Sequence, residues 1–177
     1  MSGGQGAEPG AVVVRPAEPE ELEEVSRLTV AAYRALPGPG LSDGYAAELA
    51  DAATRATQAV VLVAVAGEHL AGSVAYVPDP TSPMAEDLRN GEAGIRMLAV
   101  APEAQGRGTG TALVAACLDR AVRAGRRAVF LHSTEWMSTA HRLYLRAGFR
   151  RVEERDWEIE PGFSLLGFAK DLDSCRG

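Results

Sequence analysis

Segments with the hydrophobic pattern of strands and segments with that of helices alternate along the chain and predict an α/β (α+β) fold. Runs of β-branched and apolar residues bounded by turn residues predict seven strands, over 12–14, 59–66, 70–77, 95–100, 128–132, 150–159 and 163–172. Apolar residues at helical spacing predict four helices, over 18–35, 42–57, 109–124 and 138–146. Because the two kinds of segment follow one another without an interdomain linker, we expect one sheet flanked by helices.

The connections between these segments predict how the strands pair. Gly67-Glu68-His69 is a short link between two strand-like runs, which is typical of an antiparallel hairpin. The strand at 95–100 is followed by a helix and then by the strand at 128–132, an order that predicts a parallel crossover. Ligands of such units bind near the carboxyl ends of the strands.

Length and composition narrow the choice of class. The 177 residues suit one domain, which we place at 11–173, and the Gly-rich polar residues 1–10 predict a disordered leader. Acidic side chains outnumber basic ones by 24 to 18, and the net charge of −6 argues against nucleic acid as a partner. No apolar run approaches the roughly 18 residues of a membrane span, so we expect no membrane partner. Cys117 and Cys175 form neither a disulfide framework nor a metal-ligand pattern, so we expect no metal and a cytoplasmic location.

A Gly-rich segment, Gln105 to Thr111 (QGRGTGT), carries the strongest chemical signal. It lies between an apolar strand and an amphipathic helix. The first N–H groups of a helix have no intrahelical partner and attract phosphate, and glycine lets the backbone approach it closely. The segment lacks the Gly-Lys-Ser/Thr ending of a Walker loop and the spacing of the dinucleotide fingerprint. We therefore expect a different phosphate-bearing ligand.

Gln105, Gly108 and Gly110 match the acyl-CoA motif Gln/Arg-x-x-Gly-x-Gly/Ala, and here the sequence resembles the GCN5-related N-acetyltransferase (GNAT) superfamily. The segments 97–102 and 140–149 look like the family's other marks, in their usual order. The resemblance implies a mixed, mostly antiparallel seven-stranded sheet with about four helices. Its fourth and fifth strands splay apart, and acetyl-CoA, the co-substrate, binds between them.

The resemblance also assigns the residues that bind the cofactor. It implies that the backbone of the fourth strand bonds the pantetheine and that the N–H groups of the Gly-rich segment hold the pyrophosphate. The residues expected to bind are Leu98, Ala99, Val100, Gln105, Gly106, Arg107, Gly108, Thr109, Gly110, Thr111, Ser138 and Ala140. Met137 stands where many relatives have a cofactor-contacting asparagine. Ser133, Thr134 and Ser138 are nearby polar alternatives, although an alternative role of Ser138 is to cap the helix.

Two residues are candidates for moving protons. Tyr144 is the expected general acid, because a phenol with a pKa of about 10 stays protonated at neutral pH and can donate to a departing thiolate. The alternative is a tyrosine buried for packing. Gly94 occupies the position of the family's frequent glutamate, and Glu92, two residues earlier on the same strand face, is the candidate base acting through water. The alternatives are an exposed loop glutamate, or no dedicated base at all.

The sequence thus favours an N-acetyltransferase that moves an acetyl group from acetyl-CoA to a primary amine of a small molecule or peptide, by direct attack in a ternary complex. The substitutions Gly94 and Met137 leave open a catalytically silent acyl-CoA-binding module of the same fold. A non-enzymic interaction protein is a third hypothesis. The amine acceptor is unidentified. Trp136, Tyr33, Tyr45 and Tyr76 are candidates to line its pocket, and packing in the core or on the surface is the alternative for each. Dimers are common in the family, so a homodimer is a further expectation.

Overall fold

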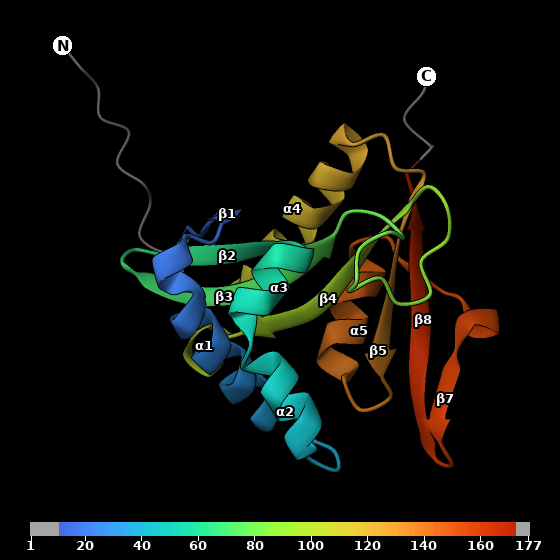
Figure 1. Ribbon diagram of the computed structural model, residues 1–177, viewed down its shortest axis with the longest axis horizontal. Coiled ribbons are helices and arrows are strands. Elements are labelled where there is room, and N and C mark those ends of the chain that lie inside the picture. The colour runs from blue at the N-terminus through green and yellow to red at the C-terminus, as the bar shows by residue number, and fades with distance from the viewer. Residues whose placement is uncertain (1–10, 173–177) are drawn as a thin grey trace.

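One mixed sheet runs through residues 11–172, the part of the chain that this computed structural model describes (Figure 1). Its eight strands follow the order β1-β2-β3-β4-β5-β8-β6, and β7 also pairs with β8. The strands are β1 (Val13–Pro16), β2 (Val60–Ala66), β3 (His69–Val77), β4 (Glu92–Val100), β5 (Ala128–Thr134), β6 (Arg150–Arg151), β7 (Trp157–Glu160) and β8 (Phe163–Asp171). The β2–β3 pair is antiparallel and the β4–β5 pair is parallel, which confirms the predicted hairpin and crossover. The leader predicted for residues 1–10 lies outside the described residues.

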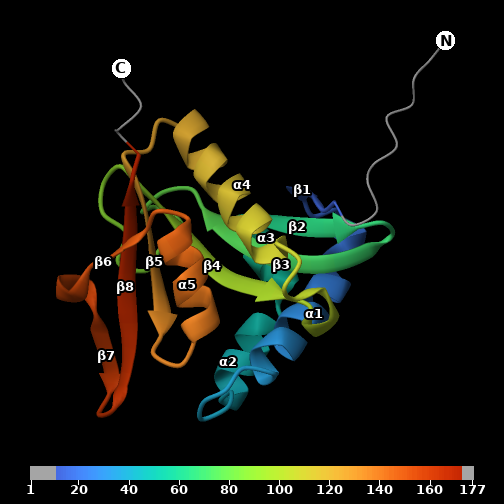
Figure 2. The ribbon, with the colours of Figure 1, turned by 180° about the vertical axis from the view of Figure 1, so that it is seen from behind.

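Helices cover both faces of the sheet. They are α1 (Leu22–Arg34), α2 (Asp43–Leu49), α3 (Ala52–Gln58), α4 (Thr109–Arg123) and α5 (Ser138–Arg146). The first three lie on one face, and α4 and α5 lie on the opposite face (Figures 1 and 2). No helix of residues 11–172 has the length and apolarity needed to cross a membrane.

Two predicted elements are each divided in the structure, which explains why it has one strand and one helix more than expected. The predicted helix at 42–57 breaks at Asp51, whose carboxylate accepts the N–H of Thr54 and starts α3 as a separate helix. The predicted strand at 150–159 breaks at the 3₁₀ turn Glu153–Arg155. After this turn, the side chain of Asp156 accepts a hydrogen bond from the N–H of Gly167. In a regular ladder, that N–H would bond to a backbone carbonyl of the neighbouring strand.

The hydrophobic core fixes the orientation of the sheet on both faces. On one face, Leu113 and Cys117 of α4 are fully buried in a cluster shared with β2, β3 and β5. On the other face, Val25 of α1 is fully buried against Val61 and Val63 of β2. Each such side chain contributes about 1.5–3 kcal/mol through burial. Cys117 acts as a small apolar residue, because burial raises the pKa of its thiol to about 12.

The parallel pair β4–β5 separates along its length. Its paired residues are Glu92 with Ala128, Ala93 with Val129, and Gly94 with Phe130. Beyond Gly94, β4 continues to pair only with β3, while β5 pairs with β8 as far as Thr134. The two strands therefore diverge toward their carboxyl ends, as Figure 1 shows, and the predicted splay is confirmed.

Candidate functional site

A bulge interrupts β4 where it leaves β5. Between the pairs Ser73–Ala99 and Ala75–Arg96, β4 advances three residues while β3 advances two. The extra residue of a bulge lacks a ladder partner. Met97 adopts a positive φ of 53°, which is rare for a residue with a side chain. The bulge therefore leaves backbone polar groups of β4 without strand partners at the divergence.

A small cavity opens at this point. Its volume is about 120 Å³, and it is bounded by β4, β5, the end of α1 and the start of α5. Four of the residues expected at the site line it: Leu98, Ser138, Ala140 and Tyr144. Ligand pockets usually measure ~300–1,000 Å³. The cavity is therefore large enough for reacting groups and too small for a whole coenzyme.

The Gly-rich segment lies beside the end of β4. The turn Pro102–Ala104 joins β4 to this segment, and Figure 2 shows the first turn of α4 next to the end of β4. Gly106 and Gly108 have φ values of +76° and +80°, a region that favours glycine. A Cβ added at either would meet no atom within 4 Å. The two glycines thus keep an open approach to the helix N-terminus.

The N–H groups at the start of α4 are available to a ligand. Gly108 is the N-cap residue, and the N–H of Ala112 is the first to bond back to it. In the described chain, no backbone acceptor is found for the N–H groups of 106–111. Unpaired N–H groups and the helix dipole together favour a pyrophosphate here. These residues therefore fit the phosphate-bearing part of acetyl-CoA.

The other residues of this segment differ in what they contribute. Gln105, Arg107 and Thr111 are exposed, so their side chains can reach a bound phosphate. Thr109 is buried and its hydroxyl points to the carbonyl of Ala104 at 3.5 Å. Gly110 serves packing, because an added Cβ would lie 2.7 Å from Cδ1 of Leu143 on α5. Gly110 therefore allows α4 to approach α5 at the cavity.

The start of α5 shows whether Ser138 caps the helix, an alternative that the sequence left open. Met137 is the N-cap residue of α5 and makes no side-chain cap bond, while Ser138 is the first residue inside the helix. Ser138 is therefore not the cap, and its side chain is at the cavity wall. Ala99, in contrast, is buried and does not line the cavity.

Tyr144 is both a core residue and a cavity residue. Its ring packs against Phe149 and Phe168, with centroids 5.8 Å away in each case, and only 5 % of the residue is exposed. Burial raises the pKa of Tyr144, and the neighbouring thiol of Cys117 raises it further. The phenol therefore keeps its proton at neutral pH and faces the cavity as a donor.

The structure does not bring Glu92 to the cavity. It is buried at the opposite end of β4, five residues before Met97 and about 16 Å away along an extended strand. Its carboxylate accepts two bonds from Arg155, at 2.9 and 3.0 Å, and another from the N–H of Arg89. At Gly94, the position of the family's glutamate, an added Cβ would lie 3.2 Å from Cδ1 of Leu88, a tight contact with the end of a side chain.

Arg155 completes this buried cluster. Its guanidinium also contacts Asp87 and lies 3.4 Å from the centroid of the Phe130 ring. Burial alone lowers the pKa of Arg155, but the bonds to Glu92 and Asp87 outweigh that effect and the pKa is raised. The cluster is thus a closed network of opposite charges.

His132 of β5 lines the cavity and was not selected as a site residue from the sequence. Its Nε2 lies 2.8 Å from the carbonyl oxygen of Arg155. A carbonyl can only accept, so Nε2 carries the proton and Nδ1 has the free lone pair. Nδ1 is buried and has no partner among residues 11–172. The sequence signal was weak, namely a polar residue two positions after the buried Phe130 on one strand face.

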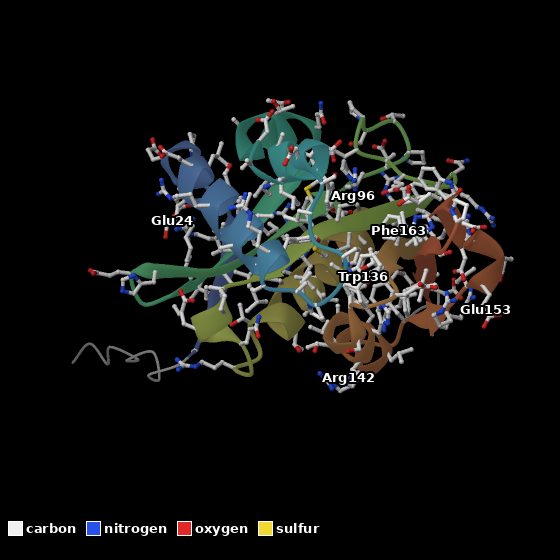
Figure 3. All side chains as sticks on the ribbon, turned by 90° about the horizontal axis from the view of Figure 1, so that it is seen from below. Glu24, Arg96, Trp136, Arg142, Glu153 and Phe163 are labelled. Atoms are coloured by element: carbon white, nitrogen blue, oxygen red, sulfur yellow. The ribbon has the colours of Figure 1, made fainter. Side chains whose placement is uncertain are left out.

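Aromatic side chains form the other wall. Trp136 lines the cavity and stacks on Phe163, with ring centroids 5.1 Å apart and planes 18° apart (Figure 3). A Cβ at Gly38 would lie 2.8 Å from the indole, so the loop after α1 packs directly against Trp136. Tyr33 of α1 also lines the cavity, and its ring is 6.0 Å from that of Tyr45.

Comparison with known proteins gives a consistent result. A profile of the acetyltransferase (GNAT) family matches residues 22–149. A search of curated proteins finds no match. Among solved structures, a putative GNAT acetyltransferase from Desulfovibrio desulfuricans aligns with a TM-score of 0.71 and 21 % identity, over 91 % of this chain and 99 % of that chain.

Two further structures are described with a bound coenzyme. The paiA N-acetyltransferase of Thermoplasma acidophilum, in complex with coenzyme A, aligns with a TM-score of 0.70 and 15 % identity, over 92 % and 99 % of the two chains. The putative acetyltransferase yncA of Salmonella typhimurium, with acetyl-CoA, aligns with a TM-score of 0.65 and 18 % identity, over 94 % and 97 %. At these identities the likeness shows a shared fold.

Proposed function

The chain belongs to the acetyltransferase (GNAT) family, and from that premise we propose that it transfers an acetyl group from acetyl-CoA to a primary amine in a ternary complex. One observation carries the proposal. The open, glycine-lined N-terminus of α4 lies at the end of the strand whose bulge and divergence create the cavity. A phosphate site and a reaction site are therefore joined by one continuous backbone.

Each part of this backbone has a task. Acetyl-CoA supplies the acetyl group as an activated thioester. The N–H groups of 106–111 hold the pyrophosphate, and the exposed Gln105 and Arg107 add side-chain contacts. The backbone of Leu98 to Val100 holds the pantetheine and polarises the acetyl carbonyl. Ser138 and Ala140 form the wall of α5 beside it.

Two side chains handle the protons of the transfer. As the amine nitrogen bonds to the acetyl carbon and the carbon–sulfur bond breaks, the Tyr144 hydroxyl donates to the departing sulfur. The amine must lose a proton in the same step. We assign this proton to Nδ1 of His132, because the residue lines the cavity and Nδ1, which is buried, has no partner among residues 11–172, while Nε2–H is held by the Arg155 carbonyl. Glu92 has no part in this mechanism, because Arg155 binds its carboxylate.

A catalytically silent acyl-CoA-binding module is the second candidate. The observation that favours it is that Gly94 stands at the position of the family's frequent glutamate, while the carboxylate of Glu92 is bound by Arg155. Binding of acetyl-CoA does not separate the two functions, whereas turnover does. We also place the protein in the cytoplasm, where the buried thiol of Cys117 stays reduced.

The test is release of free CoA thiol from acetyl-CoA in the presence of a broad panel of primary amines, with acetylated products identified by mass spectrometry. We expect at least one amine to stimulate thiol release and to gain an acetyl group. Tight binding of acetyl-CoA with no acetylated amine would establish the silent module instead.

A further inference from the structure

Arg96 sets the charge of the cavity. It lies on β4 directly before the bulge, and it is the one charged side chain in the cavity wall of the described chain. No aspartate or glutamate of residues 11–172 lines that cavity. A second ammonium group on an acceptor would therefore face a guanidinium and would find no carboxylate in the wall described here.

Arg96 is paired less tightly than three other arginines of the described chain. Arg15, Arg151 and Arg155 each bind one carboxylate with two short bonds, between 2.7 and 3.0 Å. Arg96 has only long contacts, from Nε to Glu86 at 3.4 Å and from Nη1 to the carbonyl of Met84 at 3.4 Å. Its planar fork is suited to a carboxylate. Within the described chain, that fork is not closed by a bidentate partner.

Neighbouring groups add hydrogen-bond donors. Tyr33 lines the cavity, and burial, followed by the neighbouring Tyr45, raises the pKa of its phenol well above the usual value. Its hydroxyl therefore remains a donor. Behind this wall, Arg55 is buried and bonds to the carbonyls of Glu48 and Leu49 and to the sulfur of Met97. The guanidinium of Arg55 adds positive charge close to the bulge.

We propose that the amine acceptor is a free amino acid whose carboxylate binds Arg96 and whose apolar side chain packs on Trp136. This inference rests on the proposed function, since it names the acceptor of the same site. The apolar part of the wall is formed by Leu36, Pro37 and Trp136. The indole of Trp136 stacks on Phe163, and both side chains are labelled in Figure 3. Polyamines and aminoglycosides, which carry several ammonium groups, are excluded as preferred acceptors by the same charge.

The experiment compares amines that differ only by the carboxylate. The pairs are leucine with 3-methylbutylamine, phenylalanine with 2-phenylethylamine, and methionine with 3-(methylsulfanyl)propylamine, and spermidine represents the polycations. We expect kcat/KM for the best amino acid to exceed that of its decarboxylated partner and of spermidine by about ten-fold or more, the size of a hydrogen bond to a charged group. Equal or better use of the decarboxylated amines overturns the proposal and leaves the acetyltransferase function standing.

Variants assign the effect to Arg96. Arg96→Gln should lower kcat/KM for the amino acids more than for the decarboxylated amines, so that the ratio within each pair falls toward one, and Arg96→Glu should reverse the preference toward the amines. Glu86→Gln is the matched control, because it removes the long contact to Arg96 and should keep or increase the preference for amino acids. A preference that survives Arg96→Gln overturns the assignment.

A binding measurement separates this proposal from the proposed function. Isothermal titration of the same pairs into protein saturated with CoA forms dead-end complexes that need no transfer. Tighter binding of the amino acids, lost in Arg96→Gln, supports the proposal even if turnover is absent and the acetyltransferase function fails. Amino acids that bind no better than their decarboxylated partners contradict it.

Discussion

The two ends of the β4–β5 pair differ in how their polar groups are satisfied. At the paired end, the guanidinium of Arg155 binds the carboxylates of Glu92 and Asp87, and both oxygens of the Glu92 carboxylate accept hydrogen bonds. At the diverging end, Nδ1 of His132 has no partner in the described chain, and Arg96 has only long contacts. Buried polar groups are normally paired, so groups left open mark a place for a ligand. We therefore expect the charged cluster to have a structural role and the open end to bind the ligand.

The largest effect should come from breaking the cluster of Glu92, Arg155 and Asp87 at the paired end of β4 and β5. Arg155→Met leaves the Glu92 carboxylate buried without its main partner, so we expect the free energy of unfolding to fall by about 3–5 kcal/mol in urea denaturation. Arg150→Met, which removes an exposed pair with Asp171, should cost less than about 1 kcal/mol. Replacing both partners, as in Glu92→Met with Arg155→Met, should recover much of the loss. A loss below 1 kcal/mol in Arg155→Met would contradict the closed network.

At the open end, Tyr144→Phe should change rate and not stability. The ring and its packing are kept, while the donor to the sulfur is lost, so we expect kcat to fall about 10²- to 10⁴-fold. Acetyl-CoA affinity, measured by isothermal titration, should stay within two-fold. Unchanged turnover would return Tyr144 to the packing role that the sequence left open.

His132 should affect the rate through its imidazole. Its Nδ1 has no partner among residues 11–172, and its Nε2 is held by the carbonyl of Arg155. His132→Asn removes the ring nitrogen that we assign as the proton acceptor, so we expect kcat/KM to fall about 100-fold.

Two controls assign that loss of rate to His132. His141→Asn is the matched variant, because Nε2 of His141 is also bonded to a carbonyl, that of Thr134, but its ring does not line the cavity. Its kcat/KM should stay close to the wild-type value. Nitrogen-15 NMR should also find the Nε2–H tautomer of His132 in the free protein. An Nδ1–H tautomer, or a kcat/KM that is unchanged in His132→Asn, would remove His132 from the mechanism.

The smallest effect concerns the ion pair of Arg15 and Glu21. Like Arg155 and Glu92, these residues are joined by two short hydrogen bonds, but they are more exposed. Arg15 binds Glu21 with bonds of 2.7 and 2.9 Å, and mainly this bond lowers the pKa of Glu21 from 4.5 to about 2. A lowered folded-state pKa adds stability above pH ~4.5 that is lost as the pH falls toward 2. Glu21→Gln should therefore destabilise by less than about 1 kcal/mol at pH 6, and by progressively less below pH 4.5.

Urea denaturation across this range measures the difference. Glu23→Gln is the control, since Glu23 pairs with Arg27 on the exposed face of α1 and should give a smaller change. A Glu21→Gln effect that persists undiminished at pH 3 would contradict the assigned ion pair.

The sequence predicts the elements well because their signals are local. The hairpin, the crossover and the glycines of 105–111 are each read from a few consecutive residues, and the structure confirms the fold they imply. Caps are harder to predict, because Asp51 and Asp156 divide their elements through side-chain bonds that hydrophobic periodicity does not register.

The site depends more on contacts between distant residues, which explains what the sequence could not supply. Glu92 has the spacing of a base, but Arg155, 63 positions later, binds it. The tautomer of His132 is set by the carbonyl of the same Arg155, and that residue is turned inward only because the predicted strand breaks. The bulge at Met97 likewise requires the register with β3.

Isothermal titration with acetyl-CoA tests the central claim most directly, using two glycines of matched conformation. Gly108 at the start of α4 and Gly162 in the β7–β8 turn have φ values of +80° and +84°, and a Cβ at either meets no atom within 4 Å. Gly108→Glu and Gly162→Glu therefore impose the same backbone strain and charge at two places. We predict one bound acetyl-CoA per chain in the wild-type protein and in Gly162→Glu, and none in Gly108→Glu. Equal binding by both variants, or no binding by the wild-type protein, would contradict an acetyl-CoA site at the N-terminus of α4.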